Sequence, residues 1–173
     1  MLIGVDFDNT IVCYDRLFHQ LALERGWIPP ELEVDKSSVR NYLRGVDRED
    51  NWTLLQGIAY GSRIDEAAPF AGVKEFFSRC HYEQVPVCII SHKTRHPYRG
   101  PNFDLHEAAR GWLKTHQFFG DSGMGLSEEQ VFLEETKQAK LARIAAAGCT
   151  HFIDDLPEFL LEEDFFPGVC RIL

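Results

Sequence analysis

The chain has 173 residues, of which 45% are hydrophobic and 26% charged, and its formal net charge at pH 7 is −9. This composition is typical of an ordinary globular protein, and the length suits one domain or one domain with a modest insertion. The negative charge argues against nonspecific binding to nucleic acid, because the phosphate backbone would be repelled. No apolar stretch approaches the roughly 20 residues that a membrane helix needs. Nothing precedes the first apolar run, so we expect no signal peptide.

The five cysteines are odd in number and scattered, and no two of them form a Cys-x-x-Cys pair. This spacing argues against a disulfide framework and against a zinc site. We therefore expect reduced thiols and a cytoplasmic protein.

The first predicted element is a buried strand at residues 2–5, which form a short continuous apolar run. The following stretch, 12–70, contains no convincing strand. Three helices are predicted within it, at 16–26, 37–44 and 51–60. We interpret 12–70 as a small helical insertion after the first strand.

From residue 72 onward, helical patterns alternate with short apolar runs. The predicted helices cover 72–83, 104–116 and 136–148, and the predicted strands cover 85–90, 131–133, 151–153 and 169–173. Thr136 is a good N-cap for the last helix, and Gly148 is a good stop. Pro86 has no backbone N–H to donate, so its strand should begin after it or bend there.

This alternation predicts an α/β fold, with a doubly wound, Rossmann-like and mainly parallel sheet joined by right-handed crossovers. Residues 1–11 and 71–173 would form this core, and residues 12–70 would form the insertion.

Polar side chains follow the predicted strands at the edge where a doubly wound sheet binds its ligands. They are Asp6, Asp8, Ser91, Asp154 and Asp155, with Lys137 and Lys140 at the start of the helix after the third strand. Four carboxylates in one pocket would repel one another unless a cation neutralised them. Oxygen ligands without clustered His or Cys favour Mg²⁺ over zinc. The pattern therefore predicts a magnesium site that also holds a phosphoryl group.

In their order and context, these residues resemble the four motifs of the haloacid dehalogenase superfamily of phosphohydrolases, and the resemblance spans essentially the whole chain. The segment Asp6-Phe7-Asp8-Asn9-Thr10 matches the first motif, Asp-x-Asp-x-Thr. Ser91 matches the second motif, a lysine would supply the third, and Asp154-Asp155 matches the fourth.

The resemblance implies a role for each of these residues. Asp6 would attack phosphorus, and Asp8 would protonate the leaving oxygen and then activate water. Ser91 and the lysine would bind the phosphoryl group. The metal ligands implied are Asp6, Asp8, Asp154 and Asp155.

Two lysines compete for the third motif. Lys137 has Leu141 four residues on and Ile144 seven residues on, a spacing that resembles that of family phosphatases, and we favour it. Lys140 lies one turn later and could share its face of the helix. The residues that we expect to contact substrate are Thr10, His92, Lys93 and Lys140.

The insertion resembles a small helical cap, which in this superfamily covers the site and selects the substrate. Two substrate classes stay open. The Asp-Asp-x-Pro ending at Asp154 and the loop after Ser91 resemble 5′-nucleotidases, whereas a small cap suits a sugar phosphate equally well. A nucleotidase would need an aromatic platform for the base, for which Trp52 and Tyr14 are the candidates.

We therefore expect a Mg²⁺-dependent phosphatase that hydrolyses a small phosphorylated metabolite through an aspartyl phosphate. Dehalogenases of the superfamily lack an acid at the position of Asp8, so its presence favours phosphoryl transfer over carbon–halogen cleavage. Two alternatives remain, a phosphate-binding or partner-binding module with little turnover and a phosphomutase. The sequence determines neither the natural substrate nor the oligomeric state.

Overall fold

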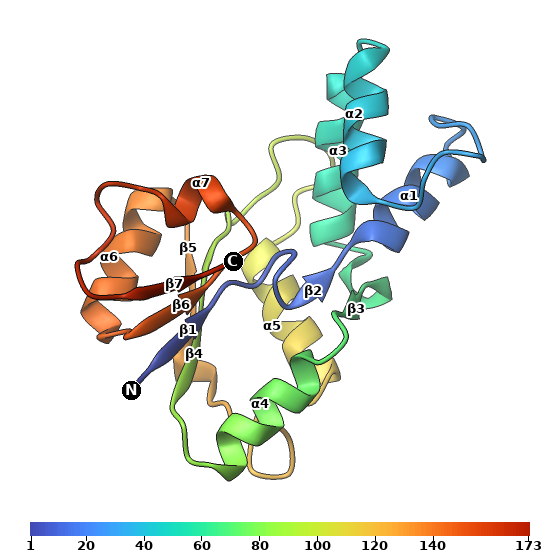
Figure 1. Ribbon diagram of the computed structural model, residues 1–173. Helices are drawn as coiled ribbons and strands as arrows, with labels where there is room; N and C mark the ends of the chain where they lie inside the picture. Colours follow the sequence, from blue (N-terminus) through green and yellow to red (C-terminus); the bar gives the residue numbers. More distant parts are fainter. The chain divides into compact units, whose positions relative to one another are not determined.

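A computed structural model describes all residues from Met1 to Leu173, and the chain divides into two compact units (Figure 1). The first unit comprises 1–12, 69–94 and 113–173. The second unit comprises 13–68 and 95–112. The second unit thus contains most of the predicted insertion together with a later stretch that we had assigned to the core.

The first unit is built on a five-stranded parallel sheet with the order β5-β4-β1-β6-β7. Its strands are β1 (Ile3–Val5), β4 (Val87–His92), β5 (Val131–Glu134), β6 (His151–Ile153) and β7 (Cys170–Ile172). The chain runs outward from β1 to β4 and β5, and then crosses to the other side of β1 at β6. The predicted doubly wound α/β fold is confirmed, and β4 begins after Pro86 as expected.

Helices cover both faces of this sheet. They are α4 (Val73–Tyr82), α6 (Lys137–Ala147) and α7 (Pro157–Leu160), with a short 3-10 turn, η2 (Glu128–Gln130). Figure 1 shows α6 and α7 on one side of the sheet and α4 on the other. Ile144 of α6 and Phe159 of α7 share a buried core with Phe152 of β6. A Cβ atom on Gly4 would lie 2.6 Å from the Phe152 ring, so β1 needs glycine where this ring crosses it.

The second unit is helical. It contains α1 (Asp15–Glu24), α2 (Lys36–Gly45), α3 (Glu49–Tyr60), the turn η1 (Ile64–Glu66) and most of α5 (Leu105–Thr115), whose last turn belongs to the first unit. The helices α1, α2 and α3 pack against one another and bury Phe18, Leu43 and Leu55. All six longer helices that the sequence predicts are present in the two units.

Two very short strands, β2 (Val12–Cys13) and β3 (Ala68–Pro69), form a separate two-stranded ribbon. The sequence predicts no convincing strand between 12 and 70, and this prediction is wrong. Strands of two residues are too short to produce a detectable alternation of apolar and polar side chains.

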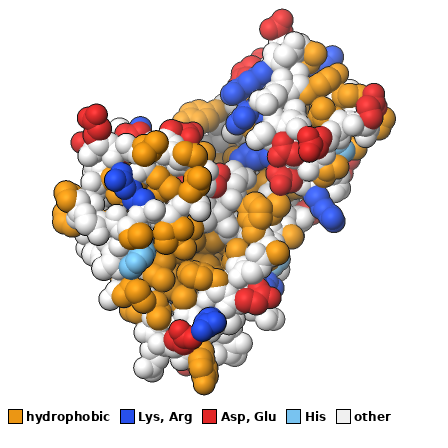
Figure 2. Space-filling view, in the orientation of Figure 1, with side chains coloured by type: hydrophobic (Ala, Val, Ile, Leu, Met, Phe, Trp, Pro, Cys, Tyr) orange, Lys and Arg blue, Asp and Glu red, His pale blue; other side chains and the backbone are white.

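None of the helices combines the length and the apolar character needed to cross a lipid bilayer. All five cysteines are thiols rather than disulfides. Figure 2 shows apolar side chains gathered on the visible face of the first unit, with charged side chains around them.

Candidate active site

The loop after β1 brings two carboxylates to the carboxyl edge of the sheet. The backbone N–H of Asp6 donates to the carbonyl of Ile153 on β6 over 2.9 Å, so Asp6 continues the ladder of β1. The chain then turns sharply, and the N–H of Asn9 donates to the carbonyl of Val12 over 3.0 Å. Asn9 has a φ of 62°, a left-handed value that asparagine tolerates better than most residues. This turn holds Asp8 close to Asp6.

A buried ion-pair network joins β1, β6 and α6. The Nζ of Lys140 lies 2.6 Å from Oδ1 of Asp6 and 2.6 Å from Oδ2 of Asp154. The three residues are at most 5% exposed. Burial raises the pKa of Asp6 to about 7, although the Lys140 ammonium acts in the opposite direction. Burial alone would lower the pKa of Lys140, but Asp6 and Asp154 raise it above its ordinary value.

The lysine in contact with Asp6 is Lys140, whereas the sequence led us to favour Lys137 for the third motif. The Nζ of Lys137 lies 2.6 Å from Oε1 of Glu162, and 42% of the Lys137 side chain is exposed. Lys140 precedes the fully buried Ile144 by four residues and shares its face of α6. Lys137 is the first residue of α6, where Glu162 pairs with its ammonium.

Three carboxylates form a candidate metal site. Asp6, Asp154 and Asp155 each offer an oxygen atom, and these atoms lie within 4.8 Å of one another. The backbone N–H of Asp155 donates to Oγ1 of Thr10 over 3.1 Å, and Oδ1 of Asp154 accepts from the N–H of Leu156 over 3.0 Å. Such hydrogen bonds orient metal ligands. The all-oxygen donor set suits a hard cation such as Mg²⁺.

The Asp8 side chain, which we expected among the metal ligands, lies outside this cluster. Its two carboxylate oxygens accept hydrogen bonds from Nζ of Lys93, over 2.9 and 2.8 Å. The Lys93 side chain is 2% exposed and the Asp8 side chain 18%. We expected Lys93 to contact substrate. Its pairing with Asp8 could not be predicted from the sequence, because 85 residues separate the two positions in the chain.

The net charge of the ionised groups in the site equals in size, and is opposite in sign to, the charge of one divalent cation. They belong to the carboxylates of Asp6, Asp8, Asp154 and Asp155 and the ammonium groups of Lys93 and Lys140. When all six groups are ionised, two negative charges remain. A divalent cation would neutralise them, so the residues present fit Mg²⁺.

A buried hydroxyl completes the arrangement. Ser91, near the end of β4, is 1% exposed, and its Oγ has no hydrogen-bond partner in the protein. Because a buried hydroxyl without a partner is costly, this Oγ is available to an oxygen of a ligand. His92 ends β4 and is exposed. Thr10, which we expected to contact substrate, accepts a hydrogen bond from the backbone N–H of Asp155 and thereby holds this candidate metal ligand.

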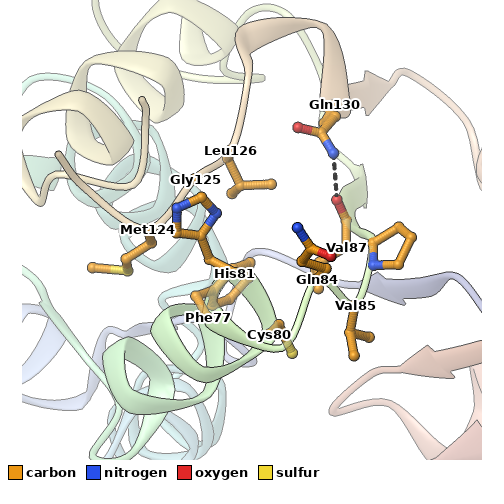
Figure 3. Close-up of a pocket in the computed structure, with 11 residues that line it drawn as sticks. Phe77, Cys80, His81, Gln84, Val85, Val87, Met124, Gly125, Leu126 and Gln130 are labelled. Carbon is orange, nitrogen blue, oxygen red and sulfur yellow. Dashed lines mark hydrogen bonds between the residues drawn. The ribbon is translucent and has the colours of Figure 1, made fainter. Parts of the chain in front are cut away.

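A cavity of about 280 Å³ lies at the opposite, amino edge of the sheet, around Val87 at the start of β4 (Figure 3). His81 and Gln84 line it, and Nε2 of Gln130 donates to the carbonyl of Val87 over 2.9 Å. No carboxylate lines this cavity. It therefore lacks the cluster of carboxylates that lies at the carboxyl edge.

No protein-family model matches the chain, and neither does any characterised protein. Two solved structures match it at low similarity. A HAD-superfamily hydrolase from Ehrlichia chaffeensis has a TM-score of 0.47 and 14% identity, over 98% of this chain and 84% of its own. A dehalogenase has a TM-score of 0.46 and 10% identity, over 92% of this chain and 78% of its own. At these values the matches carry no argument about activity, which has to be inferred from the residues of this chain.

Proposed function

We propose that the protein is a Mg²⁺-dependent phosphatase of the haloacid dehalogenase superfamily. It would hydrolyse a small phosphomonoester through an aspartyl phosphate on Asp6. The observation that carries the proposal is the buried network of Asp6, Lys140 and Asp154 beside the carboxylate of Asp155. A structural role alone would not favour so many buried charges, because each is costly to remove from water.

The reaction would take place in two steps. In the first, an Asp6 carboxylate oxygen attacks phosphorus and the bond from phosphorus to the leaving oxygen breaks. The leaving oxygen takes the proton carried by the Asp8 carboxyl, which thereby becomes a carboxylate. In the second, Asp8 takes a proton from water while the water oxygen attacks phosphorus. The bond between phosphorus and Asp6 then breaks and inorganic phosphate leaves.

The remaining groups would stabilise charge on the phosphoryl oxygens. The Lys140 ammonium lies against the nucleophile, and the Ser91 Oγ is buried without a partner. Both are suited to bind phosphoryl oxygens in a site from which water is excluded. Mg²⁺, held by Asp6, Asp154 and Asp155, would supply further positive charge to the same oxygens.

For the substrate, we favour a sugar phosphate over a nucleoside monophosphate. The two rings that a nucleotide would need as a platform, Tyr14 and Trp52, are buried. Tyr14 packs against Tyr60 with ring centroids 4.9 Å apart, and Trp52 packs against Phe18 at 4.8 Å. These rings form the core of the second unit, which we propose to act as the cap. The five thiols support our proposal of a cytoplasmic location.

The test is release of phosphate from p-nitrophenyl phosphate with and without Mg²⁺, by the wild type and by Asp6→Asn. We expect Mg²⁺-dependent release by the wild type and loss of release in Asp6→Asn, with a phosphorylated Asp6 found by mass spectrometry of acid-quenched wild type. Undiminished release by Asp6→Asn would refute the assignment of the nucleophile. A silent wild type across a panel of phosphorylated metabolites would instead favour a binding module, and transfer of the phosphoryl group within the substrate would identify a phosphomutase.

A further inference from the structure

We propose that Lys93 is a positioning residue that acts through Asp8, holding its carboxylate where it can move protons during phosphoryl transfer. The inference rests on the proposed function for the role of Asp8. It departs from the expectation that Lys93 contacts substrate, because both oxygens of Asp8 are bonded to the Lys93 ammonium.

The backbone of Lys93 is fixed by the sheet. Lys93 follows β4 directly, and its N–H donates to the carbonyl of Glu134 at the end of β5 over 2.8 Å. The side chain is 2% exposed, and its Nζ lies 5.5 Å from the centre of the Phe7 ring. A lysine side chain held in this way samples far fewer conformations than that of a solvent-exposed lysine. Its ammonium therefore has a fixed position from which it can donate hydrogen bonds to a neighbouring carboxylate.

The Asp8 carboxylate is subject to a repulsion from Asp6 that the Lys93 ammonium opposes. The carboxylate of Asp8 carries the same charge as the carboxylate of Asp6, two residues earlier in the chain. Mutual repulsion would push the partly exposed Asp8 carboxylate toward solvent. Two hydrogen bonds from one ammonium, over 2.9 and 2.8 Å, oppose this motion and restrict rotation of the carboxylate.

The two buried lysines therefore have separate partners. Lys140 pairs with Asp6 and Asp154, the proposed nucleophile and a proposed metal ligand. Lys93 pairs with Asp8, the proposed proton carrier. Loss of Lys93 should slow proton transfer while leaving substrate binding and the metal site in place.

A double-mutant cycle tests this role, using Lys93→Met, Asp8→Asn, the double variant and Lys74→Met, an exposed lysine on α4, as the control. We expect Lys93→Met to lower kcat for p-nitrophenyl phosphate by about 10-fold or more, with KM within about threefold of wild type. The loss should be larger for phenyl phosphate, whose leaving group depends more on protonation. Adding Lys93→Met to Asp8→Asn should cost nothing further in a single turnover, since the group through which Lys93 acts is already gone.

Two kinetic results would overturn the proposal. A rise in KM with unchanged kcat would make Lys93 a substrate-binding residue. Losses that multiply in the double variant would show that Lys93 acts independently of Asp8.

A crystal structure of Lys93→Met gives a readout that does not depend on activity. We expect the Asp8 carboxylate to leave its position while Asp6, Lys140 and Asp154 keep theirs. An unmoved Asp8 would refute the positioning role even if wild type proved inactive, so the failure of this inference and that of the proposed function are distinguishable. If Lys93→Met does not fold, the variant Lys93→Met with Asp8→Asn, which removes both charges of the pair, supports the same comparison with Asp8→Asn alone.

Discussion

At the scale of single residues, burial separates two lysines that the sequence presents as near equivalents. Lys140 is enclosed with Asp6 and Asp154, whereas Lys137 lies at the surface beside Glu162. An exposed ion pair contributes little to stability or function, because water and salt screen it. A buried lysine between two carboxylates cannot be removed without leaving their charges uncompensated.

This contrast leads to a direct prediction. Lys140→Met should lower kcat/KM by at least about 100-fold, as expected when a positive group that stabilises a developing charge is removed. Lys137→Met should stay within about twofold of wild type, because it removes only a partly exposed pair with Glu162. Steady-state kinetics of both variants with p-nitrophenyl phosphate check this, after circular dichroism has shown both to be folded. The reverse order of effects would restore Lys137 as the third-motif lysine.

At the scale of elements, the start of α6 determines where Lys140 sits. Thr136 is in an extended conformation, and its Oγ1 accepts a hydrogen bond from the N–H of Ala139 over 3.0 Å. At the other end, Gly148 takes a φ of 73°, a left-handed value that glycine adopts without strain. The two caps define the length and register of α6, and so place Lys140 on the face that meets the sheet.

The N-cap can be tested by substitution. Thr136→Ala removes the acceptor for the Ala139 N–H and should lower the free energy of unfolding by about 1 kcal/mol. Thr136→Ser keeps the hydroxyl and should remain near wild type. Urea unfolding of the three proteins measures the difference. Equal losses in the alanine and serine variants would show that the methyl group of Thr136, and not its hydrogen bond, stabilises the helix.

At the scale of the whole molecule, the burial of Asp6 makes the stability of the folded protein depend on pH. Asp6 is buried with a pKa near 7, against 3.8 for an ordinary aspartate. Between these two values the folded protein retains a proton that the unfolded chain has lost. The stabilising contribution of this proton is fully present below about pH 4 and is lost as the pH rises through about 7.

We therefore expect the metal-free protein to lose stability between about pH 4 and about pH 7 through Asp6. Asp6→Asn has no proton to lose, so its stability relative to wild type should be greater at about pH 8 than at about pH 5. Mg²⁺ should restore the wild type at the higher pH, by about 2.7 kcal/mol at 100 times its dissociation constant. Urea unfolding in a chelator and in Mg²⁺ measures all three effects. Parallel pH profiles for the two proteins would exclude Asp6 as their source.

Much of the fold could be predicted because its signals are local. The five apolar runs became the five strands of the sheet, and Thr136 and Gly148 marked the ends of α6 as expected. The elements that were missed are β2, β3, α7 and the 3-10 turns η1 and η2. Each is two to four residues long, and no periodicity can develop over so few positions. The inclusion of 95–112 in the second unit was also missed, since it depends on contacts between distant segments.

The sequence by itself determined which polar residues follow each strand. It thereby also determined that Asp6, Ser91 and Asp154 gather at one edge of a parallel sheet. Parallel strands bring their carboxyl ends together whatever the side chains do afterwards. Only the tertiary structure decided the pairing of charges within that edge. Asp6 lies 134 residues from Lys140, and Asp8 lies 85 residues from Lys93. Side chains so far apart in the chain meet only when the sheet and α6 have packed.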